Sequence, residues 1–234
     1  MPQSVDTNKT NGYVKKRPKN PIKFKLQLNE EQKEAKATIL EKDITILTGA
    51  AGSGKTLLAC QIALDGIFTR QYDKVIITRP TVSKEEIGFL PGDLREKMDP
   101  WVQPIYQNMF MLYDKEKIEK TIEEGKIEIV PVSFMRGRTF VNSFVIVDEA
   151  QNVTHEQMIM ITARLGLNSK MVICGDTAQI DLKNRGDSGL KFLYTLARRI
   201  KGMASITLKE NHRSPIVEEL IREYESLSPG LLKG

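Results

Sequence analysis

Short apolar runs alternate with longer amphipathic segments along most of the chain. Such runs are typical of parallel strands buried on both faces, and the segments between them are typical of covering helices. The pattern predicts strands over 44–48, 75–78, 127–130, 144–148, 171–175 and 205–208. It predicts helices over 30–40, 55–68, 115–124, 155–165, 188–200 and 215–226. We therefore expect an α/β fold with a mostly parallel sheet sandwiched by helices, and assign no regular structure to 82–110.

The expected topology indicates where function should lie. In open α/β sheets, ligands bind at the edge formed by the carboxyl ends of the strands. Polar residues that directly follow the predicted strands are therefore the candidates for chemistry. Asn29 precedes the first helical segment and is placed to cap it.

The net charge is unevenly distributed. The 234 residues include 35 Lys and Arg and 30 Asp and Glu, for a net charge of +5. Residues 1–25 alone carry +6, which leaves the remainder at −1. Residues 1–22 are polar and lack periodicity, so we expect a disordered basic tail followed by one domain over 23–234. Such a tail either attracts nucleic-acid phosphates nonspecifically or serves as a solvated arm.

The sequence also bears on cellular location. No apolar run approaches the ~18 residues of a membrane span, and the first residues lack the apolar core of a secretory signal. Cys60 and Cys174 lie in apolar segments, as buried free thiols of a reducing compartment do. We expect a cytoplasmic protein without a membrane partner.

The strongest motif lies between the first predicted strand and the next helix. Residues 48–56 read Thr-Gly-Ala-Ala-Gly-Ser-Gly-Lys-Thr and fit the phosphate-binding P-loop in spacing and context. Backbone N–H groups of such a loop surround an anion at the positive end of a helix. We predict that Lys55 reaches the β- and γ-phosphates of ATP and that the Thr56 hydroxyl binds Mg²⁺. The predicted nucleotide-binding residues are Gly49, Ala50, Ala51, Gly52, Ser53, Gly54, Lys55, Thr56 and Leu57.

Two acids stand at the end of the fourth predicted strand. In a P-loop enzyme an acid here helps to hold Mg²⁺, so Asp148 joins Thr56 as a predicted metal ligand. Glu149 is placed to orient or deprotonate the attacking water. Ordinary surface acids are the alternative, and the P-loop upstream favours the catalytic interpretation.

Two later strands also end in candidates. Gln179 follows 171–175 and can sense the γ-phosphate by hydrogen bonding. Arg213 follows 205–208 and can neutralise charge on the γ-phosphoryl group as an arginine finger does, or else form a structural ion pair. Lys55, Glu149, Gln179 and Arg213 are the predicted catalytic residues.

Together these motifs resemble those of PhoH-family ATPases over about residues 26–226. The residues that carry the resemblance are 49–56, 77–80, 88–94, 134–140, 147–151 and 175–182. The family in turn resembles the first motor domain of superfamily-one helicases. The resemblance implies a RecA-like, helicase-like core that uses ATP and Mg²⁺. It also implies that Gln32 reads adenine and that Gln179 is the motif III glutamine.

The resemblance also shows departures. Residues 211–214 resemble the helicase Asn-Tyr-Arg-Ser element, with His212 in place of tyrosine. Only eight residues follow Ser226, so we expect no second motor domain. Either a neighbouring subunit completes the site, in a ring that the family resemblance predicts to be a hexamer, or hydrolysis is slow. The compact form resembles versions carried by bacteriophages, which implies the host cytoplasm.

Three arginines outside these motifs are further candidates. Arg79 ends a predicted strand, and Arg136 and Arg138 lie between Phe134 and Phe140. Cations interleaved with aromatic rings suit stacking on single-stranded bases, and the same cluster suits ion pairs across a subunit interface. These arginines are predicted either to bind nucleic acid or to complete a neighbour's site.

The leading hypothesis is a Mg²⁺-dependent ATPase coupled to RNA or single-stranded DNA. An ATP-switched oligomeric binding module and a P-loop kinase are the alternatives. The pair of acids at Asp148 and Glu149 favours activation of water over transfer to a small molecule.

Overall fold

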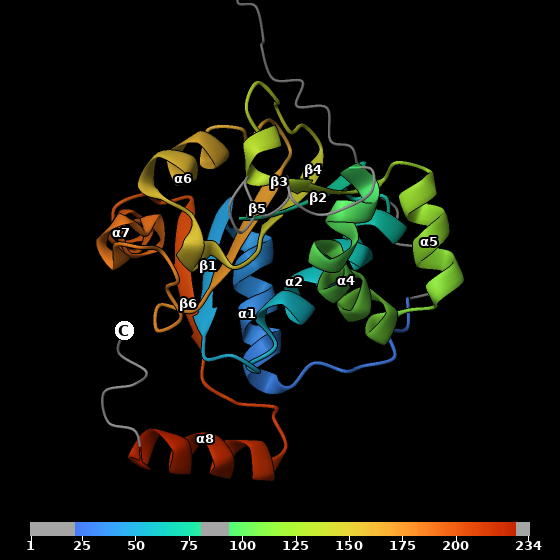
Figure 1. Cartoon of the computed structure of the whole chain (residues 1–234). Coiled ribbons are helices and arrows are strands. Elements are labelled where there is room, and N and C mark those ends of the chain that lie inside the picture. The colour runs from blue at the N-terminus through green and yellow to red at the C-terminus, as the bar shows by residue number, and fades with distance from the viewer. Residues whose placement is uncertain (1–21, 81–93, 228–234) are drawn as a thin grey trace, which may run out of the picture.

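The computed structural model describes residues 22–80 and 94–227, which form a sheet with helices on both faces (Figure 1). The strands are β1 Ile44–Gly49, β2 Lys74–Arg79, β3 Ile127–Pro131, β4 Ser143–Val147, β5 Lys170–Gly175 and β6 Met203–Leu208. The helices are α1 Glu30–Glu41, α2 Lys55–Phe68, α4 Leu94–Leu112, α5 Lys115–Glu123, α6 His155–Thr162, α7 Gly189–Ala197 and α8 Pro215–Leu227. Three short 3₁₀ helices are η1 Val132–Phe134, η2 Ala150–Asn152 and η3 Arg185–Asp187.

The described strands form one six-stranded sheet in the order β3-β2-β4-β5-β1-β6. Every neighbouring pair is parallel, with Ile44 of β1 opposite Met171 of β5, and Phe144 of β4 opposite Lys170 of β5. Strands β4, β5, β1 and β6 are therefore consecutive in space, although β1 is far from the other three in sequence. The segments that follow these four strands meet at one edge of the sheet.

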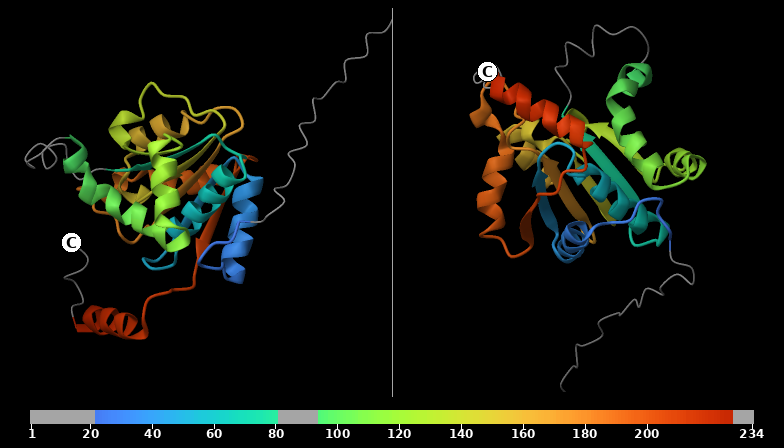
Figure 2. Two further views of the ribbon diagram at one scale, coloured as in Figure 1. Left: turned by 90° about the vertical axis from the view of Figure 1, so that its right-hand side faces the viewer. Right: turned by 90° about the horizontal axis from the view of Figure 1, so that it is seen from below.

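Figure 2 shows helices on both faces of the sheet. Alternate strand side chains enter two separate cores, one on each face. Leu47 and Ile77 face one side, where buried residues of α1, α2, α4 and α5 cover the sheet. Ile46 and Ile76 face the other side, against α6 and α7. Because both faces are covered, the central strands are mostly apolar, and the predicted helix-sheet-helix sandwich is confirmed.

All six predicted strands are present, and two of the predicted helices end three residues early. α6 ends at Thr162 rather than at residue 165, because the following residues pair with the backbone of Phe140 instead. The Phe140 N–H donates to the Arg164 carbonyl at 2.9 Å, and the Gly166 N–H donates to the Phe140 carbonyl at 2.7 Å. α7 ends at Ala197 rather than at residue 200.

Part of the unassigned region 82–110 is helical. α4 contains Pro100 and Pro104, which obscure the helix in the sequence. Its residues Ile105, Met109 and Leu112 nevertheless follow helical spacing and are fully buried. The motif residues 88–93 and all but the last residue of the predicted tail lie outside the described residues. None of the helices described here has the length and hydropathy to cross a bilayer.

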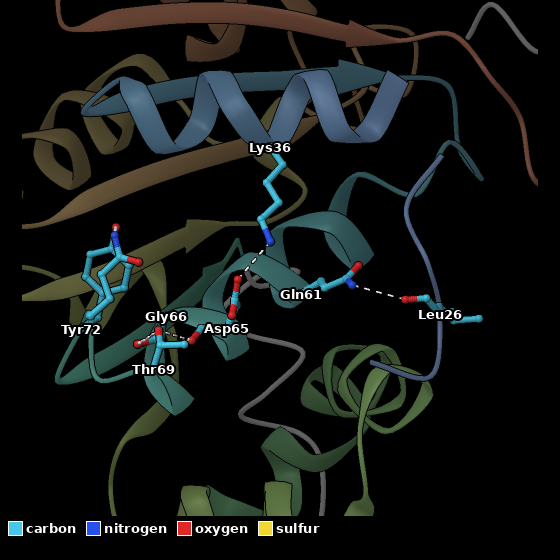
Figure 3. A network of polar contacts seen from close by, with 8 residues as sticks. Leu26, Lys36, Gln61, Asp65, Gly66, Thr69 and Tyr72 are labelled. Atoms are coloured by element: carbon cyan, nitrogen blue, oxygen red, sulfur yellow. Dashed lines mark hydrogen bonds and ion pairs between the residues drawn. The ribbon is translucent and has the colours of Figure 1, made fainter. Parts of the chain in front are cut away.

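Polar contacts join α2 to the N-terminal part of the domain (Figure 3). Lys36 of α1 forms an ion pair with Asp65 of α2 at 3.0 Å. The Gln61 side-chain amide donates to the Leu26 carbonyl at 3.3 Å. These contacts place the segment before α1 alongside the helix that the P-loop opens into.

Candidate nucleotide-binding site

A cavity of 540 Å³ lies at the carboxyl edge of the sheet, within the size range of small-molecule sites. It is bounded by the loop after β1, the residues that follow β4 and β5, and residues 26–28. The predicted site residues that line it are Gln32, Ala51, Gly52, Gly54, Lys55, Thr56, Leu57, Asp148, Glu149 and Gln179. The fold thus brings together candidates that are separated by up to about 150 positions in sequence.

The loop from Gly49 to Gly54 has a positive φ at each of its three glycines, a backbone that other residues rarely adopt. Gly52 has φ +88° and Gly54 has φ +81°, both in the left-handed region. A Cβ at Gly52 would also lie 2.8 Å from Cγ of Arg213. No side chain caps the start of α2. The first N–H groups of this helix are therefore free to bind an anion.

Lys55 folds back over this loop. Its Nζ donates to the carbonyls of Gly49 at 2.7 Å and of Ala50 at 2.8 Å. The ammonium group is thus held beside the cavity by hydrogen bonds to neutral acceptors. A triphosphate, which carries full negative charges, is a stronger acceptor for the same group.

Thr56 and Asp148 are in direct contact across the site. The Thr56 hydroxyl donates to Oδ1 of Asp148 at 2.7 Å. Asp148 is only 6% exposed. Burial raises the pKa of its carboxyl group, and the neighbouring Glu149 charge adds to the increase, while the Thr56 hydrogen bond opposes it. This buried pair of oxygen ligands fits Mg²⁺, which typically binds one or two carboxylates together with substrate phosphates.

Glu149 is held in a fixed orientation at the edge of the cavity. Its backbone lies in the left-handed region, with φ 49°. Its Oε2 accepts a hydrogen bond from the Gln151 side-chain amide at 2.6 Å, and its Oε1 lies 3.7 Å from the Arg79 guanidinium. Arg79, which does not line the cavity, is therefore an ion-pair partner of the predicted base.

Gln151 is a site residue for which sequence reasoning assigned no role. It is buried, and its Oε1 accepts a hydrogen bond from the Asp176 N–H at 3.1 Å. Because its amide also donates to Glu149, Gln151 connects the end of β4 to the loop after β5. The Gln179 N–H donates to the Asp176 carbonyl in that loop at 3.1 Å. The only sequence signal for Gln151 was its position in the motif at 147–151.

The segment after β6 lies against the P-loop. The His212 N–H donates to the Gly52 carbonyl at 3.1 Å, and Arg213 packs over the α-carbon of Gly52. Arg213 makes no ion pair with any described residue and does not line the cavity itself. The structure places this guanidinium next to the loop that would hold the phosphates.

Gln32 and His212 form the other end of the site. The Asn29 side chain accepts a hydrogen bond from the Gln32 N–H at 2.7 Å, which confirms the predicted cap of α1. Nε2 of Gln32 lies 3.5 Å from Nε2 of His212, and a Cβ on Gly54 would lie 2.9 Å from the Gln32 amide. Both residues line the cavity. His212 thus contributes an imidazole ring to this end of the site, a role that the sequence analysis did not assign to it.

Arg136 and Arg138 lie outside the cavity, near the end of β3. Arg138 forms an ion pair with Glu128 and lies over the Phe140 ring, 5.2 Å from its centroid. Arg136 is exposed and forms no ion pair with the residues described. Phe134, two residues before it, is also exposed. Arg136 is the candidate of this cluster that remains available to a partner.

The sheet, the P-loop and the acids that follow β4 define a P-loop NTPase. A family model described as PhoH-like protein matches residues 26–225, and the chain belongs to this family.

Individual relatives agree with this assignment. The chain is 42% identical over 197 residues to a PhoH-like protein of Synechocystis sp., covering 83% of this chain and 60% of the relative. It is 41% identical over 197 residues to a PhoH-like protein of Bacillus subtilis, covering 83% of this chain and 62% of the relative. The chain therefore spans less than two thirds of either relative. The large terminase of the thermophilic bacteriophage D6E is similar in fold, with a TM-score of 0.55, 11% identity, and coverage of 88% of this chain and 52% of that chain.

Proposed function

We propose that the cavity binds ATP with Mg²⁺ and that the protein hydrolyses it to ADP and phosphate. The observation that carries the proposal is the contact between Thr56 and Asp148 beside Lys55 and Glu149 in one cavity. In this arrangement the N–H groups at the start of α2 bind the phosphates. Lys55 exchanges its loop carbonyls for phosphate oxygens. Thr56 and Asp148 hold Mg²⁺, which neutralises charge on the phosphates.

Glu149 acts as the base for the attacking water. Its carboxylate is oriented by the Gln151 amide and by Arg79, so its free lone pairs have a defined direction. As the bond to the leaving phosphate breaks, negative charge spreads over the γ-phosphoryl oxygens. Arg213, which packs over Gly52, would stabilise this charge, and Gln179, which lines the cavity, would contact the γ-phosphoryl group from the loop after β5. Gln32 and His212 bind the adenine base of ATP at the other end of the cavity.

Product analysis tests this function. The full chain is incubated with ATP and Mg²⁺, and both inorganic phosphate and phosphorylated small molecules are measured. We expect phosphate in equal amount to ADP. A phosphorylated acceptor in place of free phosphate would support the kinase alternative. If ATP binds and changes the mass of the protein assembly in solution but no ADP is formed, the result would support the ATP-switched binding module.

We further propose that hydrolysis is coupled to RNA or single-stranded DNA. The support is the charge of the tail and the exposed pair Phe134 and Arg136, a ring and a cation that suit an unstacked strand. Stimulation of phosphate release by single-stranded oligonucleotides of either kind is the expected result. Equal rates with and without them would contradict the coupling.

Removal of residues 1–22 is expected to weaken nucleic-acid binding and to flatten its salt dependence. The physical reason is that these residues hold most of the net charge, and each phosphate contact that is lost lowers the salt slope by about 0.7 for single strands. Basal ATP hydrolysis should not change, because the described site contains none of these residues. The measurement is oligonucleotide affinity between low and moderate salt. An unchanged slope would show that the tail is a solvated arm.

We also propose a head-to-tail ring of subunits, with six the expected number. The unpaired Arg136 is the favoured residue for completing a neighbour's site, because Arg79 and Arg138 are already engaged within the chain.

Substitution Arg136→Ala is therefore expected to lower ATP turnover without changing ATP affinity. Mixing this variant with Lys55→Ala subunits should restore part of the activity, because the Lys55→Ala neighbours supply Arg136 to intact P-loops. The exposed base Lys120 on α5 provides the control variant Lys120→Ala. Rates in the mixture equal to the sum of the separate rates would contradict a role in trans.

A further inference from the structure

α8 carries an apolar stripe that the rest of the described chain leaves uncovered. Ile216, Leu220, Tyr224 and Leu227 recur at intervals of three or four residues and so share one face of the helix. Ile216 is 68% exposed and Leu227 is 81% exposed. Figure 1 shows α8 apart from the body of the domain, beyond the carboxyl edge of the sheet. A contiguous exposed apolar stripe on an ordered helix marks an interaction site.

The position of α8 follows from how the preceding segment is attached. The N–H groups of Lys209 and Glu210 donate to the Glu31 carboxylate at 2.8 and 3.2 Å. The His212 N–H donates to the Gly52 carbonyl. The chain is therefore fastened to the domain up to this point, and α8 starts three residues later. The attachment therefore holds the start of α8 near the P-loop.

The charge of α8 indicates what its partner must carry. Residues 215–227 contain four glutamates and one arginine, a net charge of −3. Pairing α8 with a second α8 would bring two such charges together, which is unfavourable. The complementary surface is one that is basic and has exposed apolar side chains of its own.

The chain provides such a surface on α7. Residues 188–202 contain four bases and no acid. The exposed residues of this helix include Lys191 and Phe192, and the two residues that directly follow its last residue, Arg198 and Arg199, are exposed too. Beyond the end of the helix, Ile200 and Lys201 are exposed as well. We call these six residues the α7 surface.

The α7 surface is unpaired in the described structure. None of its four bases forms an ion pair with a described residue. The neighbouring helix α6 extends it with Ile159, which is also exposed, and contributes one exposed acid, Glu156. The surface thus has the two properties that the acidic, amphipathic α8 requires.

We propose that α8 of one subunit docks on the α7 surface of a second copy of this chain. The two surfaces are different, so the contact is head-to-tail and leaves a free α8 at one end and a free α7 surface at the other. Further copies then add in the same way until the assembly closes. This inference names the surfaces that meet in the proposed ring and rests on that proposal. It does not depend on ATP hydrolysis.

Docking of α8 would also affect the nucleotide site. α8 begins two residues after Arg213, whose side chain packs over Gly52 of the P-loop. Fixing α8 on a neighbour therefore restrains Arg213 from its C-terminal side. Assembly and the position of this guanidinium are thereby linked.

Charge reversal tests the inference on the full chain. One variant combines Glu218→Lys, Glu219→Lys and Glu223→Lys on α8, and the other combines Arg198→Glu and Arg199→Glu on the α7 surface. Mass in solution is measured by sedimentation for each variant and for their equimolar mixture. We expect each variant alone to associate at least tenfold more weakly than the wild type. The mixture should regain assembly, because each α8 then meets an α7 surface of opposite charge.

The control variant Lys120→Glu/Lys183→Glu changes the net charge as much as the α7 variant does, at exposed positions elsewhere. It should assemble as the wild type, and circular dichroism should show that all variants fold. The docking would be overturned if either charge-reversal variant alone assembled as the wild type does. It would also be overturned if the mixture of the two variants failed to assemble. Wild-type assembly by the α7 variant alone would indicate α8–α8 pairing, because the α8 of that variant is unchanged, and would overturn the docking as well. A wild-type chain that stays monomeric would instead contradict the proposed ring.

Discussion

Replacing Glu149 with glutamine should leave the affinity for ATP and Mg²⁺ unchanged and slow phosphate release by ~10²–10⁴-fold. The amide has the same shape, and its oxygen can still accept the hydrogen bond from Gln151. It cannot accept a proton from water, so only the chemical step is lost. Titration calorimetry with ATP and single-turnover phosphate release measure the two effects separately.

The matched control is Glu156→Gln, which makes the same change at an exposed acid on α6 away from the cavity. It should turn over ATP at the wild-type rate. Near-normal hydrolysis by the Glu149 variant would mean that a different group activates the water.

Replacing Lys55 with alanine should weaken ATP binding by roughly 100-fold or more. Hydrogen bonds to charged groups contribute about 1.5–3 kcal/mol each, and this ammonium is placed to make two with the phosphates. The substitution removes the side chain that lies over Gly49 and Ala50 but leaves the glycine backbone intact. Calorimetry with ATP and Mg²⁺ is the measurement.

Lys120→Ala again serves as the control, since it removes an exposed base from α5 without touching the loop. Circular dichroism should show that the Lys55 variant is folded. A folded variant with unchanged ATP affinity would contradict the assignment of the P-loop.

The parts of the site that could be predicted from the sequence are those that a local motif encodes. The P-loop is contained in nine consecutive residues, and the apolar run before Asp148 identifies it as the end of a strand. The contact between Thr56 and Asp148 spans 92 positions, yet both residues were predicted because each belongs to a recognisable motif.

Contacts that depend on strand order were not predicted. Arg79 forms an ion pair with Glu149 because β2 and β4 are neighbouring strands, with Thr78 opposite Val147. Both charged residues therefore lie at the same end of these two strands. Gln151 bonds Asp176 because β4 and β5 are also neighbours. Hydrophobic patterns predict that strands exist and which residues are buried. They do not specify which strands pair, so partners across strands need the structure.

The position of α8 shows a related limit. Its amphipathic pattern predicts a helix with one apolar face, and the helix is present. The pattern equally suits a helix that packs on its own sheet. Only the structure shows that this face is uncovered, and only the charges of α7 indicate a partner.

The most direct test of the central claim is ATP hydrolysis in ¹⁸O-labelled water, with ADP and phosphate measured together. If Glu149 activates water in this cavity, each phosphate released contains one oxygen from water. Its amount equals that of ADP, and the Glu149→Gln variant forms almost none. ADP without labelled phosphate, or no ADP at saturating ATP and Mg²⁺, would contradict the account.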